Sequence, residues 1–123
     1  MNSTMFSRRR LLGTGAALGA LSLAGCATTG GPSIGRVVVV GGGPGGMEAA
    51  RRLDRDGHEV VLLEKSERLG GTLRFAALAY AANEQLLDWL RAQIEASGVE
   101  VRLNTLATAE LLKSLRPDAV VVA

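Results

Sequence analysis

Five glycines within the six residues 41–46 constrain this chain more than any other feature. They directly follow the apolar run 36–40, and positions 41, 43 and 46 fit the spacing G-x-G-x-x-G. A run of valines without polar alternation predicts a strand that is buried on both faces of a parallel sheet. Pro44, which is tolerated in the first turn of a helix, predicts that a helix over 44–55 follows the glycines. Asp56 and Gly57 are expected to end that helix.

Each glycine of the pattern has a physical task in a strand–turn–helix corner. Gly41 allows a tight turn, Gly43 lets a pyrophosphate approach the backbone, and Gly46 lets the helix pack closely on the strand. The free N–H groups and partial positive charge of the helix N-terminus then favour a phosphate. The corner is therefore predicted to bind a dinucleotide.

An acidic residue at the end of the next predicted strand, 59–64, supports this interpretation. Glu64 lies 18 residues after Gly46, close to the spacing of about 20 at which a carboxylate accepts hydrogen bonds from the adenosine ribose. Its charge would repel a 2′-phosphate, so FAD or NAD is expected rather than NADP. The competing interpretation is a glycine-rich turn without a ligand, in which Glu64 is a surface charge.

The remaining chain continues the alternation of strands and helices. A loop is expected over 65–72, strands over 99–103 and 118–123, and a short helix over 108–115, while the alanine-rich stretch 73–82 is ambiguous. This order predicts an α/β fold, a Rossmann-like domain with a parallel sheet over 36–123.

A longer helix is expected between those strands. Asn83 is expected to cap this helix, and Gly98 to end it in a left-handed conformation. One face would bury an apolar set and the other would meet solvent, with Trp89 at the edge of the core. The apolar set is Leu86, Leu87, Leu90 and Ile94, and the polar set is Asp88, Arg91 and Glu95.

The first 25 residues differ from the rest and are expected to be an export signal. Three arginines at positions 8–10 precede the apolar stretch 11–24, which is shorter than the about 20 residues of a membrane-spanning helix. The stretch 7–12 resembles a twin-arginine signal, and Leu-Ala-Gly-Cys at 23–26 resembles a bacterial lipobox. These resemblances imply an exported, periplasmic or membrane-attached lipoprotein acylated at Cys26. Cleavage near Ala27 to give a soluble protein is the alternative, and 26–35 is a flexible tether by composition.

The same three arginines account for the excess of basic over acidic residues in the chain. Without them, the part from Cys26 onward carries 11 basic and 12 acidic residues and is nearly neutral. No basic stripe is left for nucleic acid. With a single cysteine and a single histidine, the chain has no candidate disulfide, thiolate metal cluster or catalytic residue.

A second glycine motif separates FAD from NAD. Arg68-Leu69-Gly70-Gly71 resembles the R-x-G-G motif that marks the FAD site of flavoproteins with two dinucleotide-binding domains. An ordinary loop with an exposed arginine is the alternative. The residues expected to bind the cofactor are Gly41, Gly43, Pro44, Gly45, Gly46, Glu64, Lys65, Arg68, Gly70 and Gly71.

Residues 36–123 resemble the start of the FAD domain of NADH:flavin oxidoreductases of the 2,4-dienoyl-CoA reductase and trimethylamine dehydrogenase type. The resemblance lies in stretches 37–50, 58–72, 87–90, 98–103 and 113–123. It implies the FAD-binding, ADP-half portion of an exported flavin-dependent NAD(P)H oxidoreductase, with the flavin-ring and NAD(P)H parts missing. A partner chain would then supply the missing half. The alternatives are an NAD- or ADP-binding module without catalysis and a non-functional gene fragment.

Overall fold

The computed structural model describes residues 33–123. The expected signal, Cys26 and most of the tether lie outside these residues. The elements in chain order are β1 (Arg36–Val40), α3 (Pro44–Arg55), β2 (Glu59–Leu63), α4 (Leu73–Ala79), α5 (Ala81–Glu95), β3 (Glu100–Arg102), α6 (Ala109–Leu115) and β4 (Ala119–Val122). No helix among them is long and apolar enough to cross a membrane.

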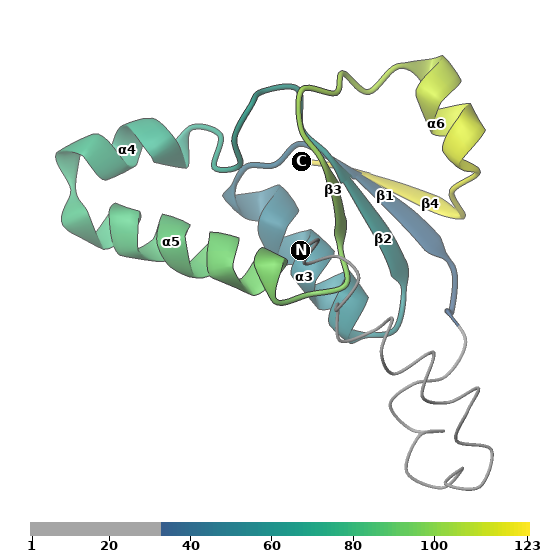
Figure 1. Cartoon of the computed structure of the whole chain (residues 1–123), viewed down its shortest axis with the longest axis horizontal. Coiled ribbons are helices and arrows are strands. Elements are labelled where there is room, and N and C mark those ends of the chain that lie inside the picture. The colour runs from purple at the N-terminus through teal and green to yellow at the C-terminus, as the bar shows by residue number, and fades with distance from the viewer. Residues whose placement is uncertain (1–32) are drawn as a thin grey trace, which may run out of the picture.

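The four strands form one parallel sheet in the order β3-β2-β1-β4. The chain winds from β1 outward to β2 and β3, then returns past β1 to add β4 on the opposite side (Figure 1). The predicted α/β fold with a parallel sheet is therefore confirmed. In such sheets ligands bind at the carboxyl ends of the strands where the winding direction reverses, which here lies between β1 and β4.

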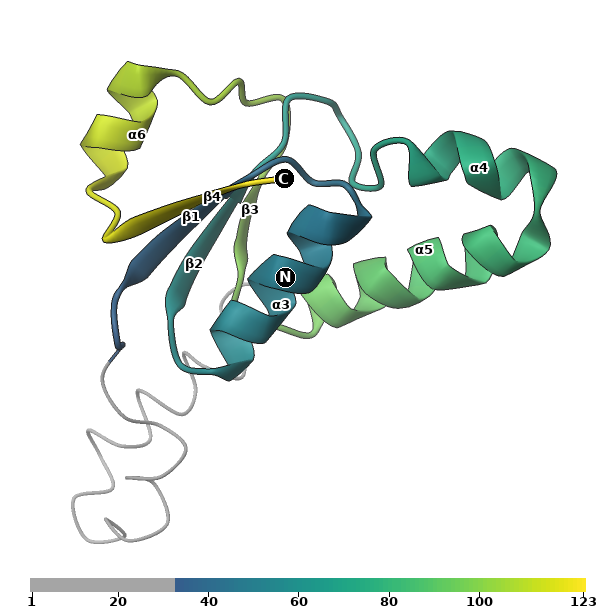
Figure 2. The ribbon, with the colours of Figure 1, turned by 180° about the vertical axis from the view of Figure 1, so that it is seen from behind.

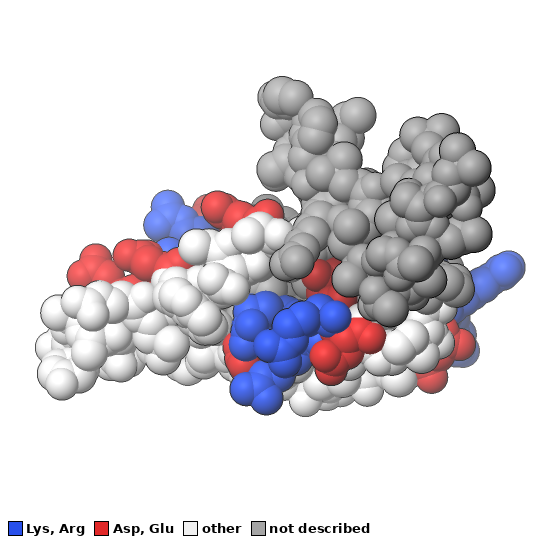
Figure 3. Space-filling view, turned by 90° about the horizontal axis from the view of Figure 1, so that it is seen from below, with Lys and Arg blue, Asp and Glu red and all other residues white. Residues whose placement is uncertain are grey.

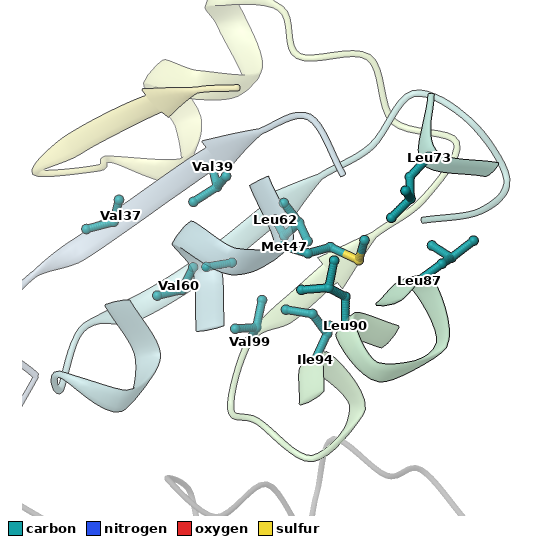
Figure 4. Close-up of a cluster of buried hydrophobic side chains, with 11 residues drawn as sticks. Val37, Val39, Met47, Val60, Leu62, Leu73, Leu87, Leu90, Ile94 and Val99 are labelled. Carbon is teal, nitrogen blue, oxygen red and sulfur yellow. The ribbon is translucent and has the colours of Figure 1, made fainter. Parts of the chain in front are cut away.

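Helices cover both faces of the sheet, and Figures 1 and 2 show α3 and α6 on opposite sides of it. On the α3 side, Met47 and Ala50 pack fully buried against the strands. Ten members of this core are labelled in Figure 4: Val37, Val39, Met47, Val60, Leu62, Leu73, Leu87, Leu90, Ile94 and Val99. Burying such side chains stabilises the fold by about 1.5–3 kcal/mol each, and it fixes α3 against the end of β1.

The other face has a smaller core under α6. Val38, Val61 and Leu63 point to this side and pack with Leu115. The alternation along β1 and β2 explains why both strands are apolar throughout, since each face meets a helix. The hydroxyl of Thr108 accepts a hydrogen bond from the N–H of Leu111 at 3.2 Å and caps α6.

Helix α5 corrects three expectations. It begins at Ala81, and Asn83 does not cap it; the Asn83 side chain instead donates to the Ala76 carbonyl oxygen in α4. Leu87, Leu90 and Ile94 are buried as predicted, but Leu86 is exposed because the hairpin of α4 and α5 extends beyond the sheet (Figure 1). Gly98 is not among the positive-φ glycines, since α5 already ends at Glu95.

Trp89 was expected at the edge of the core but is 47% exposed. The guanidinium of Arg51 lies 5.3 Å from its ring centroid, in the range of a cation–π contact. This contact joins α3 to α5 on the surface, where helical periodicity alone could not place it.

Candidate functional site

The two glycine motifs meet at the carboxyl end of β1. The N–H of Gly70 donates to the carbonyl oxygen of Gly42 at 2.8 Å. A Cβ placed on Gly71 would lie 3.0 Å from the Cα of Gly43. The turn after β1 and the turn before α4 thus form one glycine-lined surface, although they are far apart in the sequence.

Two glycines of the first motif are required by the fold itself. Gly41 has φ +106°, and a Cβ there would lie 2.5 Å from the Ala123 carbonyl oxygen. A Cβ on Gly46 would overlap the Gly41 carbonyl oxygen, which lies directly beneath the first turn of α3. These contacts account for the tight turn at Gly41 and the close helix packing at Gly46 that the glycine spacing predicts.

Gly43 and Gly45 are different, because nothing in the described protein requires glycine there. Gly43 has an ordinary φ of −75°, and its nearest neighbour for a Cβ would be the Gly71 Cα at 3.9 Å. A Cβ on Gly45 would meet nothing within 4 Å. Glycine in a helix costs about 0.5–1 kcal/mol relative to alanine. The open space above these two residues is a cradle that side chains would fill, and it fits an approaching phosphate group.

The N-terminus of α3 faces this open space with unused donors. Gly43 is the N-cap and provides no side-chain cap, while the N–H of Met47 donates to its carbonyl at 2.9 Å. Within residues 33–123, the N–H groups of Gly45 and Gly46 have no hydrogen-bond acceptor. No acidic residue lies in the first turn of α3. Free donors and the positive end of the helix dipole together favour an anion.

The first acidic residue of α3 is neutralised by its neighbours. Glu48 accepts hydrogen bonds from Arg51 and Arg52, and these bonds lower the pKa of its carboxyl to about 2. The face seen in Figure 3 carries a compact group of basic side chains bordered by acidic ones. On this face, basic and acidic side chains are mixed.

Glu64 is buried beneath the glycine turn, with 7% of its surface exposed. One carboxylate oxygen accepts from the N–H of Gly42 at 2.7 Å and the other from the N–H of Ser66 at 2.9 Å. Burial would raise the pKa of the Glu64 carboxyl, but the Ser66 and Gly42 donors and the charge of Lys65 lower it below its ordinary value. Glu64 is therefore an ionised brace of the turn, and the interpretation as a surface charge is wrong.

The role of Glu64 toward a ribose stays a prediction. Each carboxylate oxygen holds one backbone N–H and keeps a second lone pair for another donor. The position of Glu64 at the end of a strand could not reveal its hydrogen bond with the Gly42 N–H.

The loop between Glu64 and Gly70 places its basic side chains in solvent. Lys65 is exposed, and Arg68 has 67% of its side chain exposed, 3.5 Å from Glu67. Within residues 33–123, no hydrogen bond or ion pair joins either side chain to the first glycine motif. The structure therefore brings the backbone of this loop to the site, and not its arginine.

Arg91 was missed as a site residue because its charge placed it on the solvent face of α5. It is instead half-buried and donates from Nε at 3.2 Å and Nη2 at 2.6 Å to the Leu69 carbonyl oxygen. Its spacing from the buried Leu87, one helical turn earlier, was the signal that could have found it.

The sequence also matches known proteins. The family model described as FAD dependent oxidoreductase matches residues 36–120. The chain belongs to this family. FAD, the cofactor for which the family is named, was the cofactor predicted from the two glycine motifs, and that prediction is confirmed.

Two curated relatives show the extent of the likeness. The chain is 46% identical over 90 residues to the NADH oxidase of Thermoanaerobacter brockii. It is 43% identical over 90 residues to the N,N-dimethylglycine/sarcosine dehydrogenase of Chromohalobacter salexigens. Each match covers 72% of this chain but only 14% and 13% of the respective relative. The chain thus spans about one seventh of these proteins, and their whole activities are not carried over.

Solved structures give the same result for the fold. A 2-naphthoyl-CoA reductase complex superposes with a TM-score of 0.70 at 36% identity, covering 75% of this chain and 14% of that one. Histamine dehydrogenase from Rhizobium sp. 4-9 gives a TM-score of 0.68 at 33% identity, covering 72% and 13%. Both likenesses agree with the predicted resemblance to flavoproteins.

Proposed function

We propose that residues 36–123 bind the ADP half of FAD as the cofactor-binding portion of a flavin-dependent NAD(P)H oxidoreductase. The observation that carries this proposal is the open space at Gly43 and Gly45, beside helix donors that have no acceptor among the described residues. Two glycines that the fold does not require, placed at a free helix N-terminus, are explained by a pyrophosphate that occupies the space of their missing side chains.

Different residues of the site would contact different parts of the cofactor. The N–H groups of Gly45 and Gly46 would donate to the pyrophosphate, and Glu64 would accept from the adenosine ribose. Gly70 and Gly71 would let the second loop pass close to the cofactor. The bound flavin would supply the redox chemistry, and the chain would supply position and electrostatics.

Titration of the purified full chain with FAD, NAD and NADP, followed by fluorescence and calorimetry, tests this proposal. FAD is expected to bind, and NADP to bind at least about tenfold more weakly than NAD. A 2′-phosphate would bring its negative charge close to the ionised Glu64, a repulsion on the order of 1–3 kcal/mol. NADP binding as tightly as NAD would overturn the role given to Glu64, and absence of FAD binding would overturn the proposal.

A binding module without catalysis is the second candidate, and the position of the site favours it in one respect. Every feature gathered at the carboxyl end of β1 is a backbone donor, a glycine or the buried Glu64, none of which performs redox chemistry by itself. NADH oxidation by the FAD-loaded chain distinguishes the two. Turnover supports the oxidoreductase, and FAD or ADP binding without turnover supports the module.

We also propose export and a lipid anchor at Cys26. The support is the arginine group at 8–10, the short apolar stretch after it, and the sequence Leu-Ala-Gly-Cys at 23–26. A lipoprotein anchor would hold the flavin domain at a membrane surface through the tether at 26–35. Cell fractionation with mass spectrometry of the mature N-terminus tests this proposal.

A further inference from the structure

We propose that Arg91 is a positioning residue of the dinucleotide site, which acts through the second glycine loop on the N–H of Gly43. This inference rests on the proposed function, because it assigns Arg91 a part in phosphate binding. Arg91 lies on α5, outside both glycine motifs. Its guanidinium donates twice to one backbone atom, the carbonyl oxygen of Leu69.

That carbonyl belongs to a peptide group that is bonded at both ends. Its oxygen, on Leu69, accepts from Arg91, and its N–H, on Gly70, donates to the Gly42 carbonyl oxygen at 2.8 Å. The positive charge of Arg91 therefore polarises this peptide group, whose N–H donates to the first glycine turn. Hydrogen bonds to charged groups are the stronger ones, and linked bonds polarise one another.

The next peptide group continues in the same direction. The Gly42 carbonyl shares its peptide with the N–H of Gly43, and this peptide is trans, so the N–H points away from the carbonyl. Within residues 33–123, the Gly43 N–H has no acceptor. It is the free end of a chain of donors that begins at the Arg91 guanidinium. It lies at the N-cap of α3, beside the open space described above.

The surroundings of Arg91 show that holding this loop is its main contact. Among the described residues, no carboxylate forms an ion pair with Arg91, and both of its hydrogen bonds go to the Leu69 carbonyl oxygen. Gly70 is clamped on the same side, because a Cβ there would lie 2.8 Å from Leu87 and 2.6 Å from Arg74 side-chain carbons. Leu87 and Arg91 together present one turn of α5 to the loop, with packing from one and a charge from the other.

The experiment compares ADP and FAD affinity of the full-length parent with Arg91→Met, Arg91→Lys and the control Arg55→Met. Arg55→Met removes an equal charge from α3. Arg55 is exposed, and its single ion pair among the described residues is a long one, with Nε 3.9 Å from Oδ1 of Asp56. Arg91→Met should weaken ADP and FAD binding about tenfold. Arg91→Lys, which keeps a charged donor, should restore affinity to within about threefold of the parent, and Arg55→Met should leave it unchanged.

Amide NMR of the ligand-free chain gives a second readout that a merely structural role would not move. Arg91→Met should shift the resonances of Gly70 and Gly43 and speed the exchange of the Gly70 N–H, while resonances of the sheet stay in place. If the parent binds ADP and the Arg91→Met variant binds it with equal affinity, the inference is overturned and the proposed function stands. A parent that binds no ADP would overturn the proposed function and this binding role together. Unmoved glycine resonances would refute the donor chain itself.

Discussion

Replacing Gly43 by valine separates a requirement of the ligand from a requirement of the fold. The nearest atom to a Cβ at this position is the Gly71 Cα at 3.9 Å, and the backbone has an ordinary φ of −75°. The protein alone can therefore accept a side chain here. A bound pyrophosphate cannot, because the valine would occupy the space that the phosphate needs.

The expected sizes of the two effects differ widely. Valine is a poorer N-cap than glycine, which costs the free protein on the order of 1 kcal/mol. A displaced pyrophosphate loses at least two hydrogen bonds to a charged group, each worth about 1.5–3 kcal/mol. Together these bonds correspond to an affinity loss of at least about 100-fold. Flavin fluorescence measures the affinity, and circular dichroism during thermal unfolding measures the stability.

Gly46→Ala is the matched control, because its Cβ would overlap the Gly41 carbonyl oxygen within the protein. This variant should unfold at clearly lower temperature with or without ligand, while Gly43→Val should lose FAD with a smaller loss of stability. If folded Gly43→Val binds FAD like the parent, the glycine turn is not the phosphate cradle and the reasoning fails.

Three further predictions concern the same chain. Gly45→Ala should raise stability by about 0.5 kcal/mol, since its Cβ meets nothing within 4 Å in the protein, but it should weaken FAD binding, because the Cβ enters the space assigned to the pyrophosphate; thermal unfolding and FAD titration of the same sample check this. Glu64→Gln should lower the free energy of unfolding by about 1–3 kcal/mol, because an amide cannot accept from both the Gly42 and Ser66 N–H groups. The pKa of Glu64 is lowered in the folded protein, so its contribution is complete above the ordinary carboxyl pKa of 4.5 and is lost as the pH falls through the lower folded value; denaturant unfolding between pH 7 and 3 should show a steeper acid loss in the parent than in Glu64→Gln. The mature N-terminus should be an acylated Cys26 in the membrane fraction, and mass spectrometry that finds Met1 intact in cytoplasm would contradict export.

The glycine spacing and the valine run sufficed to predict the corner of β1, α3 and β2. A strand that is apolar on both faces needs helices on both sides of the sheet. Pro44 marks the first turn of a helix, and α3 does begin there. The parallel sheet follows, because strands joined by helical crossovers lie parallel.

The sequence was less informative about contacts that cross between elements. Asn83 has the chemistry of an N-cap, but α4 lies close enough to take its side chain, so the helix starts earlier. Arg91 has the charge of a solvent residue, yet the Leu69 carbonyl stands opposite it. Glu64 was placed correctly at the end of its strand, whereas its bond to Gly42 depends on the distance between two loops. Such contacts depend on tertiary geometry, which local pattern does not contain.

The most direct test of the account is an amide NMR titration of the full chain with ADP. The central claim is that a pyrophosphate binds at the N-terminus of α3, so the N–H resonances of Gly43, Gly45 and Gly46 should shift most and in proportion to occupancy. Adenosine, which lacks the phosphates, should leave these three resonances nearly unchanged at the same concentration. Saturable ADP binding that moves other residues and leaves the three glycines in place would contradict the claim.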